Sequence, residues 1–178
     1  MTTEPIESTG SAPFTDLSPV IHATTRWLLS AYPPRPGFLS FRLAEEQVRA
    51  AVAIAARLRY PTDLEAGLLL ITGTGGAGRL DWLTGSDVHP TPGEPWRAQV
   101  DEVLASWAAA LLTDADLAVA ATAIAPVPED VDRLTAPDAR DLAAAAELRH
   151  PDAMHAISAL HLPELTRTLA AAGFRGWL

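Results

Sequence analysis

Apolar residues recur every three or four positions along most of this chain, which is the spacing of an amphipathic helix. The first clear case follows Ser18 and Pro19, a pair typical of a helix start. One face of this predicted helix carries Val20, Ile21, Thr24, Trp27, Leu28 and Ala31. A second helix is predicted over 44–59, where glutamates open the segment and arginines close it, in agreement with the helix dipole.

The most regular amphipathic pattern covers 96–112 and predicts a third helix. Its apolar face carries Val100, Val103, Leu104, Trp107, Ala108 and Leu111. Asp101 and Glu102 fall on the opposite face, so we expect both carboxylates to point away from the core. Beyond this helix, prolines divide an alanine-rich region into short predicted helices at 114–125, 136–149, 151–161 and 163–172.

Two segments depart from the helical period. In "FLSFRL", 38–43, apolar and polar residues alternate as in a half-buried strand, although the segment can equally lead into the helix that follows. "LLLIT" and "RLDWLTG" flank a glycine-rich stretch, and we interpret them as the arms of a small antiparallel β-hairpin over 67–84. A helix-to-helix connection and an anion-binding loop are the alternatives for these glycines.

The glycine-rich stretch shares only its spacing with phosphate-binding motifs. Gly73-x-Gly75-x-x-Gly78 lacks the full helix and the later acidic residue of a dinucleotide-binding unit. Arg79 and Leu80 stand where a P-loop needs lysine followed by serine or threonine. We therefore expect no nucleotide to bind here.

These patterns predict a mainly α fold, all-α or α+β, in which a single helical bundle carries the small antiparallel β-hairpin. The chain has 178 residues, of which 48% are hydrophobic, enough to bury one core. Residues 1–15 are polar and lack an apolar face, so we predict a flexible tail there and one globular domain over 16–178.

Composition removes several kinds of chemistry. The chain contains no Cys, Lys or Asn, which excludes disulfides, thiolate ligands, Schiff-base lysines and a P-loop lysine. Its formal net charge of -9 repels the phosphates of nucleic acids. No apolar run is long enough to span a bilayer, and no leader pattern precedes the first helix. We expect a cytoplasmic protein without nucleic-acid or membrane partners.

One cluster of metal-type ligands lies around a proline. Glu147-x-x-His150 has the spacing of carboxylate-bridged di-iron helices, and Asp152-x-x-His155 follows directly. Pro151 separates the two halves, and two further long helices with carboxylates are missing. We interpret these residues as charges at helix ends and expect no metal or cofactor, while a site at these four positions stays an open alternative.

Five tryptophans raise the question of which serve the core and which serve contacts. Trp27 and Trp107 lie on apolar helical faces and are predicted to be buried. The candidate interaction residues lie in or beside loops or after the last helix, and they are Trp82, Trp96, Phe174, Trp177 and Leu178. The segment from Phe174 to Leu178 is expected to dock on the protein's own helices or on a partner.

No catalytic motif stands out, since Gly-x-Ser-x-Gly and His-Glu-x-x-His are both missing, and catalytic residues stay unassigned. We therefore predict a non-enzymatic interaction or regulatory protein that contacts a protein partner, or a second copy of itself, through apolar surfaces. The alternative is a small-molecule enzyme or ligand-binding protein that uses histidines and carboxylates in a pocket between the hairpin and the helices.

Overall fold

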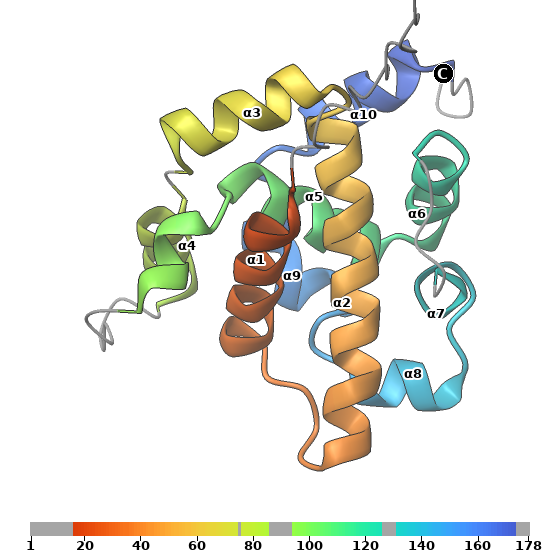
Figure 1. The fold of residues 1–178 in the computed structure, drawn as a ribbon. Coiled ribbons are helices and arrows are strands. Elements are labelled where there is room, and N and C mark those ends of the chain that lie inside the picture. The colour runs from red at the N-terminus through yellow and green to blue at the C-terminus, as the bar shows by residue number, and fades with distance from the viewer. Residues whose placement is uncertain (1–15, 75, 86–93, 126–130, 174–178) are drawn as a thin grey trace, which may run out of the picture.

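A computed structural model describes residues 16–74, 76–85, 94–125 and 131–173, and within these ranges the chain forms helices and no β-strand (Figure 1). The predicted tail at 1–15 lies outside the described residues. The elements in chain order are α1 (Ser18–Ala31), α2 (Phe38–Arg59), α3 (Asp63–Thr72), α4 (Ala77–Thr84), the 3₁₀ turn η2 (Pro95–Gln99), α5 (Glu102–Thr113), α6 (Ala115–Thr122), α7 (Asp132–Thr135), α8 (Ala139–Ala144), α9 (Pro151–Ser158) and α10 (Leu162–Ala171).

Helix α2 runs the length of the molecule, and α1, α5, α6, α7 and α8 pack around it (Figure 1). The helix predicted at 44–59 is confirmed, but it begins six residues earlier, so "FLSFRL" leads into a helix and is not a strand. Gly37 precedes it with φ of 121°, a conformation that L side chains rarely adopt. Of the alternating residues, Leu39 and Phe41 are exposed and only Leu43 is buried. Their alternation therefore reflects no buried sheet face.

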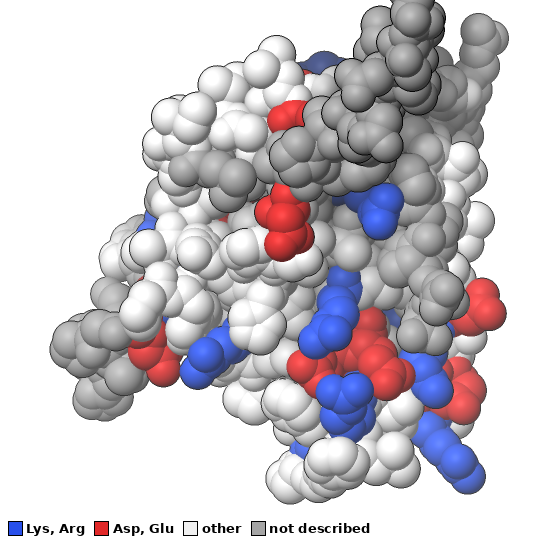
Figure 2. Space-filling model, viewed as in Figure 1, with Lys and Arg blue, Asp and Glu red and all other residues white. Residues whose placement is uncertain are grey.

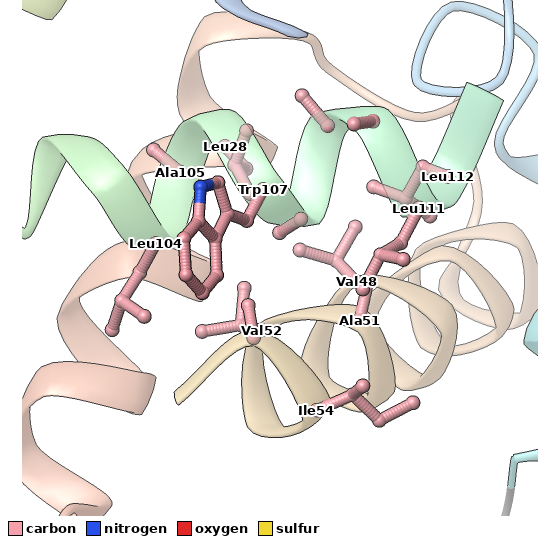
Figure 3. Close-up of a cluster of buried hydrophobic side chains, with 14 of the residues drawn as sticks. Leu28, Val48, Ala51, Val52, Ile54, Leu104, Ala105, Trp107, Leu111 and Leu112 are labelled. Atoms are coloured by element: carbon pink, nitrogen blue, oxygen red, sulfur yellow. The ribbon is translucent and has the colours of Figure 1, made fainter. Parts of the chain in front are cut away.

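The core lies between α2 and α5. Every residue from Leu104 to Leu112 is buried, because α5 is covered by α2 on one side and by α9 on another. Figure 3 shows Trp107 directed from α5 toward Val52 of α2. Trp27 and Trp107 are each 1% exposed, which confirms their assignment to the core. Their indole N–H groups donate to Asp81 Oδ1 at 2.9 Å and to the His161 carbonyl at 3.2 Å, respectively.

The helix predicted at 96–112 is divided into η2 and α5, and the expectation for its two acids is wrong. Asp101 is 7% exposed and caps α5, accepting from the N–H groups of Val103 and Leu104 at 2.8 and 3.2 Å. Glu102 is mostly covered and pairs with Arg79. Periodicity places acids on a polar face, but an N-cap position satisfies the free N–H groups of the first turn and overrides that placement.

The β-hairpin predicted at 67–84 is wrong, because this segment forms α3 and α4. The alternative of a helix-to-helix connection is the one observed. Thr62 and Glu65 form a reciprocal capping box that starts α3. Their Thr-x-x-Glu spacing is readable in the sequence. Gly73 ends α3 with φ of 72°.

The alanine-rich region after Thr113 forms short helices, as predicted, but most are shorter than expected. The segment 114–125 contains α6, 151–161 contains α9, and 163–172 contains most of α10. The segment 136–149 contains only the six residues of α8, which begins at a capping box between Asp138 and Asp141.

No single helix among the described residues is long and apolar enough to cross a membrane. Helices α5 and α6 meet the length and composition criteria only when taken together, and they are bent by 116° at their junction.

Candidate interaction surface

Helix α3 is apolar but largely exposed. Of its described side chains only Ala66 is buried, and Leu69 packs partly against the core. Leu64, Leu68 and Ile71 are 74%, 50% and 82% exposed. Because they stand at positions i, i+4 and i+7, they lie along one face of the helix, and we name them the α3 stripe. Figure 2 shows the surface over α3 as largely uncharged.

The charges on α3 are negative. Asp63 and Glu65 stand in its first turn, and the helix carries no basic residue. These acids favour helix formation through the dipole at the same time as they border the α3 stripe. The apolar face is therefore combined with an acidic flank.

A cavity of about 530 Å³ lies between α3 and the amino end of α5, lined in part by Tyr60, Leu68 and Asp101. Tyr60 donates to Asp101 Oδ2 at 2.5 Å, although 41 positions separate the two residues. Glu102 Oε1 lies 3.0 Å from Arg79 and 2.9 Å from the His161 ring.

A further ion pair, between Arg59 and Glu164 at 2.8 Å, links the end of α2 to α10 on the same side of the molecule. Most of the titratable groups around this cavity thus have a protein partner. The network joins α2, α4, α5 and α10 beneath α3.

The pKa of Tyr60 is raised, first by burial of the phenol and then by its hydrogen bond to Asp101 and the charge of that carboxylate. Burial also raises the pKa of Tyr32. Both phenols therefore remain protonated at neutral pH. Because Tyr60 acts as the donor, its role in the cavity is to hold Asp101, which in turn caps α5.

Stability at high pH is expected to depend on Tyr60. A phenol with a raised pKa contributes stability that is present below the unfolded value of about 10 and is lost as pH rises. With no Lys or Cys in the chain, Tyr32 and Tyr60 are the only side chains that titrate near that pH. Urea unfolding between about pH 8 and 11 should show a smaller loss of stability for Tyr60→Phe than for wild type.

At neutral pH the same variant should lose about 1 kcal/mol, the ordinary contribution of one hydrogen bond. Tyr32→Phe is the matched control, since it leaves the bond between Tyr60 and Asp101 intact. Identical pH dependence of wild type and Tyr60→Phe would show that this bond does not couple to stability.

The predicted interaction residues lie in different surroundings. Trp82, on α4, is 69% exposed. Trp96 is half-buried, with its ring against the guanidinium groups of Arg26 at 4.7 Å and Arg97 at 5.5 Å. Its position is thus explained by packing of η2 on α1. Three further candidates lie outside the described residues, and they are Phe174, Trp177 and Leu178.

The open alternative of a metal site gains no support from the geometry. Within the described ranges, no group of three or more His, Asp or Glu side chains is arranged to hold a metal ion. Asp152 lies in the first turn of α9, where the helix dipole favours a carboxylate, and His155 lies in its last turn. His150 is the residue that precedes α9, and Glu147 is exposed on the turn before it.

No protein-family model matches this chain, and neither a curated protein nor a solved structure gives a significant match. The candidate surface therefore rests on geometry. Sequence reasoning missed the α3 stripe because the hairpin interpretation assigned Leu68 and Ile71 to a strand and left Leu64 in the connection before it. The signal was present in the spacing of Leu64, Leu68 and Ile71 after a capping box.

Proposed function

We propose that this chain is a non-enzymatic, cytoplasmic interaction protein whose α3 stripe docks an apolar segment of a protein partner. The observation that supports the proposal is the exposure of Leu64, Leu68 and Ile71 on one face of a ten-residue helix. Burying a large aliphatic side chain contributes roughly 1.5–3 kcal/mol. Three such side chains supply several kcal/mol, from which the entropic cost of association is subtracted.

Charge complementarity defines the partner further. Asp63 and Glu65, in the first turn of α3, flank the stripe. A partner segment that carries apolar residues beside positive charge fits this surface, because opposite charges speed association and disfavour acidic competitors. An amphipathic helix with arginine or lysine beside its apolar face is one such segment.

The cavity beneath α3 gives weaker support to the alternative of an enzyme or ligand-binding protein. Tyr60, Glu102 and His161 are held by protein partners, and their contacts stabilise the junction of α4, α5 and α10. We assign them a structural role that keeps the base of α3 in place.

A designed peptide tests the proposal directly. We expect an 18-residue helical peptide with a leucine face and arginine flanks to bind wild-type protein in fluorescence anisotropy. The same peptide with glutamate flanks should bind at least tenfold more weakly, on the order of 1.4 kcal/mol. The double variant Leu64→Ser/Ile71→Ser should lose at least tenfold in affinity for the basic peptide.

Folding controls separate docking from damage. Because Leu64 and Ile71 are largely exposed, the double variant should unfold within about 1 kcal/mol of wild type. Val119→Ser removes an exposed apolar residue on α6 and should leave peptide binding unchanged. Equal affinity of wild type and the double variant, or no binding of either peptide, would refute the α3 stripe as a docking face.

A further inference from the structure

A second cavity lies at the end of the molecule where α2 and α10 finish (Figure 1). It has a volume of about 900 Å³ and is bounded by the start of α1, the end of α2, the turn after α6 and the last turn of α10. Ile21, Leu58, Ile124 and Ala171 give it apolar walls. Pockets of this size enclose most of a drug-sized ligand, so it has room for more than one large side chain. We name it the α10 groove.

One cation of the α10 groove lacks a partner. Arg57 lines the groove, is exposed, and has neither a hydrogen bond nor an ion pair among the described residues. Arg59, two positions later, differs because it pairs with Glu164. A guanidinium that is not held by a carboxylate is available to stack on an aromatic ring. The groove therefore suits an occupant that combines apolar side chains with an aromatic face.

The way α10 ends brings the next residues back toward its own last turn. Gly173 has φ of 103°, and its N–H donates to the Ala170 carbonyl at 3.1 Å. A positive φ and this bond are features of the Schellman motif, in which the residue after the glycine packs against the last turn of the helix. Here the residue after the glycine is Phe174. Thr168 and Ala171, from that last turn, line the groove.

Composition distinguishes the stretches that continue from this end of the molecule. Residues 1–15 precede Asp16, 126–130 follow Ala125, and 174–178 follow Gly173. Polar residues and prolines predominate in the first two, whereas three of the five residues in "FRGWL", 174–178, are large and apolar. Five extended residues span about 16–18 Å. This reach lets the whole segment lie along the groove while Gly173 stays at the end of α10.

We propose that residues 174–178 dock in the α10 groove of the same copy. Phe174 packs on the last turn of α10, and Trp177 lies on the apolar wall with its ring beside Arg57. The tether favours the same copy, because a short linker gives an effective concentration on the order of millimolar, which a second copy at micromolar concentration does not match. The inference does not depend on the proposed docking role of α3.

Nuclear Overhauser effects in the full chain test the contact directly. The five tryptophans give five indole signals, and Trp177→Phe identifies the one from Trp177. We expect effects between the Trp177 ring and the methyl groups of Ile21, Leu58 or Ile124, none of which is near Trp177 in the sequence. An equal mixture of isotope-labelled and unlabelled protein separates contacts within one copy from contacts between copies. No effect to these methyl groups, or effects between copies alone, would overturn the proposal.

A blocked groove provides a matched pair of variants. Ala171→Arg places a long charged side chain in the groove and should remove the effects between Trp177 and Ile21. Ala170→Arg makes the same change at the neighbouring exposed residue, which is not part of the groove lining, and should leave them intact. Effects that persist in Ala171→Arg would show that the segment lies elsewhere.

Thermal unfolding gives an independent measure. Trp177→Ser should lower Tm by at least about 3 °C, because it exposes the apolar wall and removes a docked indole. Trp82→Ser removes a tryptophan that is 69% exposed and should change Tm by about 2 °C or less. Equal shifts of Tm in the two variants would contradict docking of Trp177.

The proposed function and this inference fail separately. Trp177→Ser should bind the basic peptide as wild type does, since the α10 groove and the α3 stripe consist of different residues. Overhauser effects from Trp177 to Leu64 or Ile71 would place the segment on the α3 stripe and overturn the inference. Loss of peptide binding by Leu64→Ser/Ile71→Ser alone would leave the proposed function in place in that case.

Discussion

Replacing Arg149 with alanine is expected to lower the free energy of unfolding by about 3 kcal/mol, because it leaves buried hydrogen-bond acceptors in three parts of the chain without their donor. The guanidinium donates from Nε to Gln47 Oε1 at 2.6 Å. It also donates to the carbonyls of Arg133 at 2.8 Å, Leu134 at 3.1 Å and Leu112 at 3.4 Å. Burial lowers the pKa of Arg149, opposed by the charge of Asp141. Urea unfolding at neutral pH measures the loss.

The bond to Gln47 extends the effect beyond one side chain. Gln47 is fully buried on α2 and donates to the carbonyls of Leu43 and Asp141, so it joins α2 to the start of the α8 region. Without Arg149 its oxygen has no remaining partner among those described. The variant should therefore loosen the packing of α7 and α8 on α2 before the rest of the core.

Two substitutions make the result specific. Arg149→Lys keeps a positive charge but cannot reproduce the planar set of donors, so it should recover only a small part of the loss. Arg140→Ala removes an exposed arginine from α8 and should change stability by about 0.5 kcal/mol or less. If Arg149→Ala unfolds within 1 kcal/mol of wild type, the network is not a major source of stability.

Local sequence signals predicted the helices that face the core. They failed to predict hydrogen bonds between residues that are far apart in the sequence. The faces of α1 and α5 were predictable because burial of Trp27 and Trp107 imposes a helical period. The bonds from Arg149 to Gln47 and from Tyr60 to Asp101 join positions 102 and 41 residues apart. No local pattern encodes such pairs, since either partner alone resembles an ordinary surface residue.

The error over α3 has a different cause. The run from Leu68 to Thr72 is apolar enough for a strand, and the glycines after it are typical of a turn. The capping box of Thr62 and Glu65, which begins six positions before Leu68, gave the opposite indication and fixed the helix. This helix carries the α3 stripe. The candidate surface was therefore missed because the segment was interpreted as a strand, although its apolar residues were evident in the sequence.

The apolar start of α2 was equally visible in the sequence but received another interpretation. Alternation in "FLSFRL" suggested one buried face, whereas Phe38, Leu39 and Phe41 form the exposed start of a helix. An apolar pattern reports that side chains avoid water, and it does not report whether the chain itself or another molecule covers them. Trp82 is a further apolar side chain that the rest of the chain does not cover.

The second large effect is expected in the glycine-rich stretch. Two glycine-to-alanine substitutions there should change the stability of the protein in opposite directions. A Cβ at Gly76 would overlap the backbone nitrogen of Glu102 and stand 2.9 Å from its Cα. Glu102 is the first residue of α5, and its position is fixed because Asp101 caps the helix and Gly76 donates to the Val100 carbonyl at 3.2 Å. Gly76 itself has φ of -101° and ψ of -29°, which alanine adopts freely, so only the contact opposes substitution.

Gly76→Ala is therefore expected to destabilise the protein by about 2–3 kcal/mol, because the connection between α3 and α4 must move away from α5. Gly78→Ala is the control, since no atom lies within 4 Å of its added Cβ. Gly78 lies inside α4, where alanine is favoured over glycine by about 0.8–1 kcal/mol, so this variant should be more stable than wild type. Thermal and urea unfolding of both variants measure the difference. Stabilisation by both substitutions would show that α5 and the connection are not in close contact.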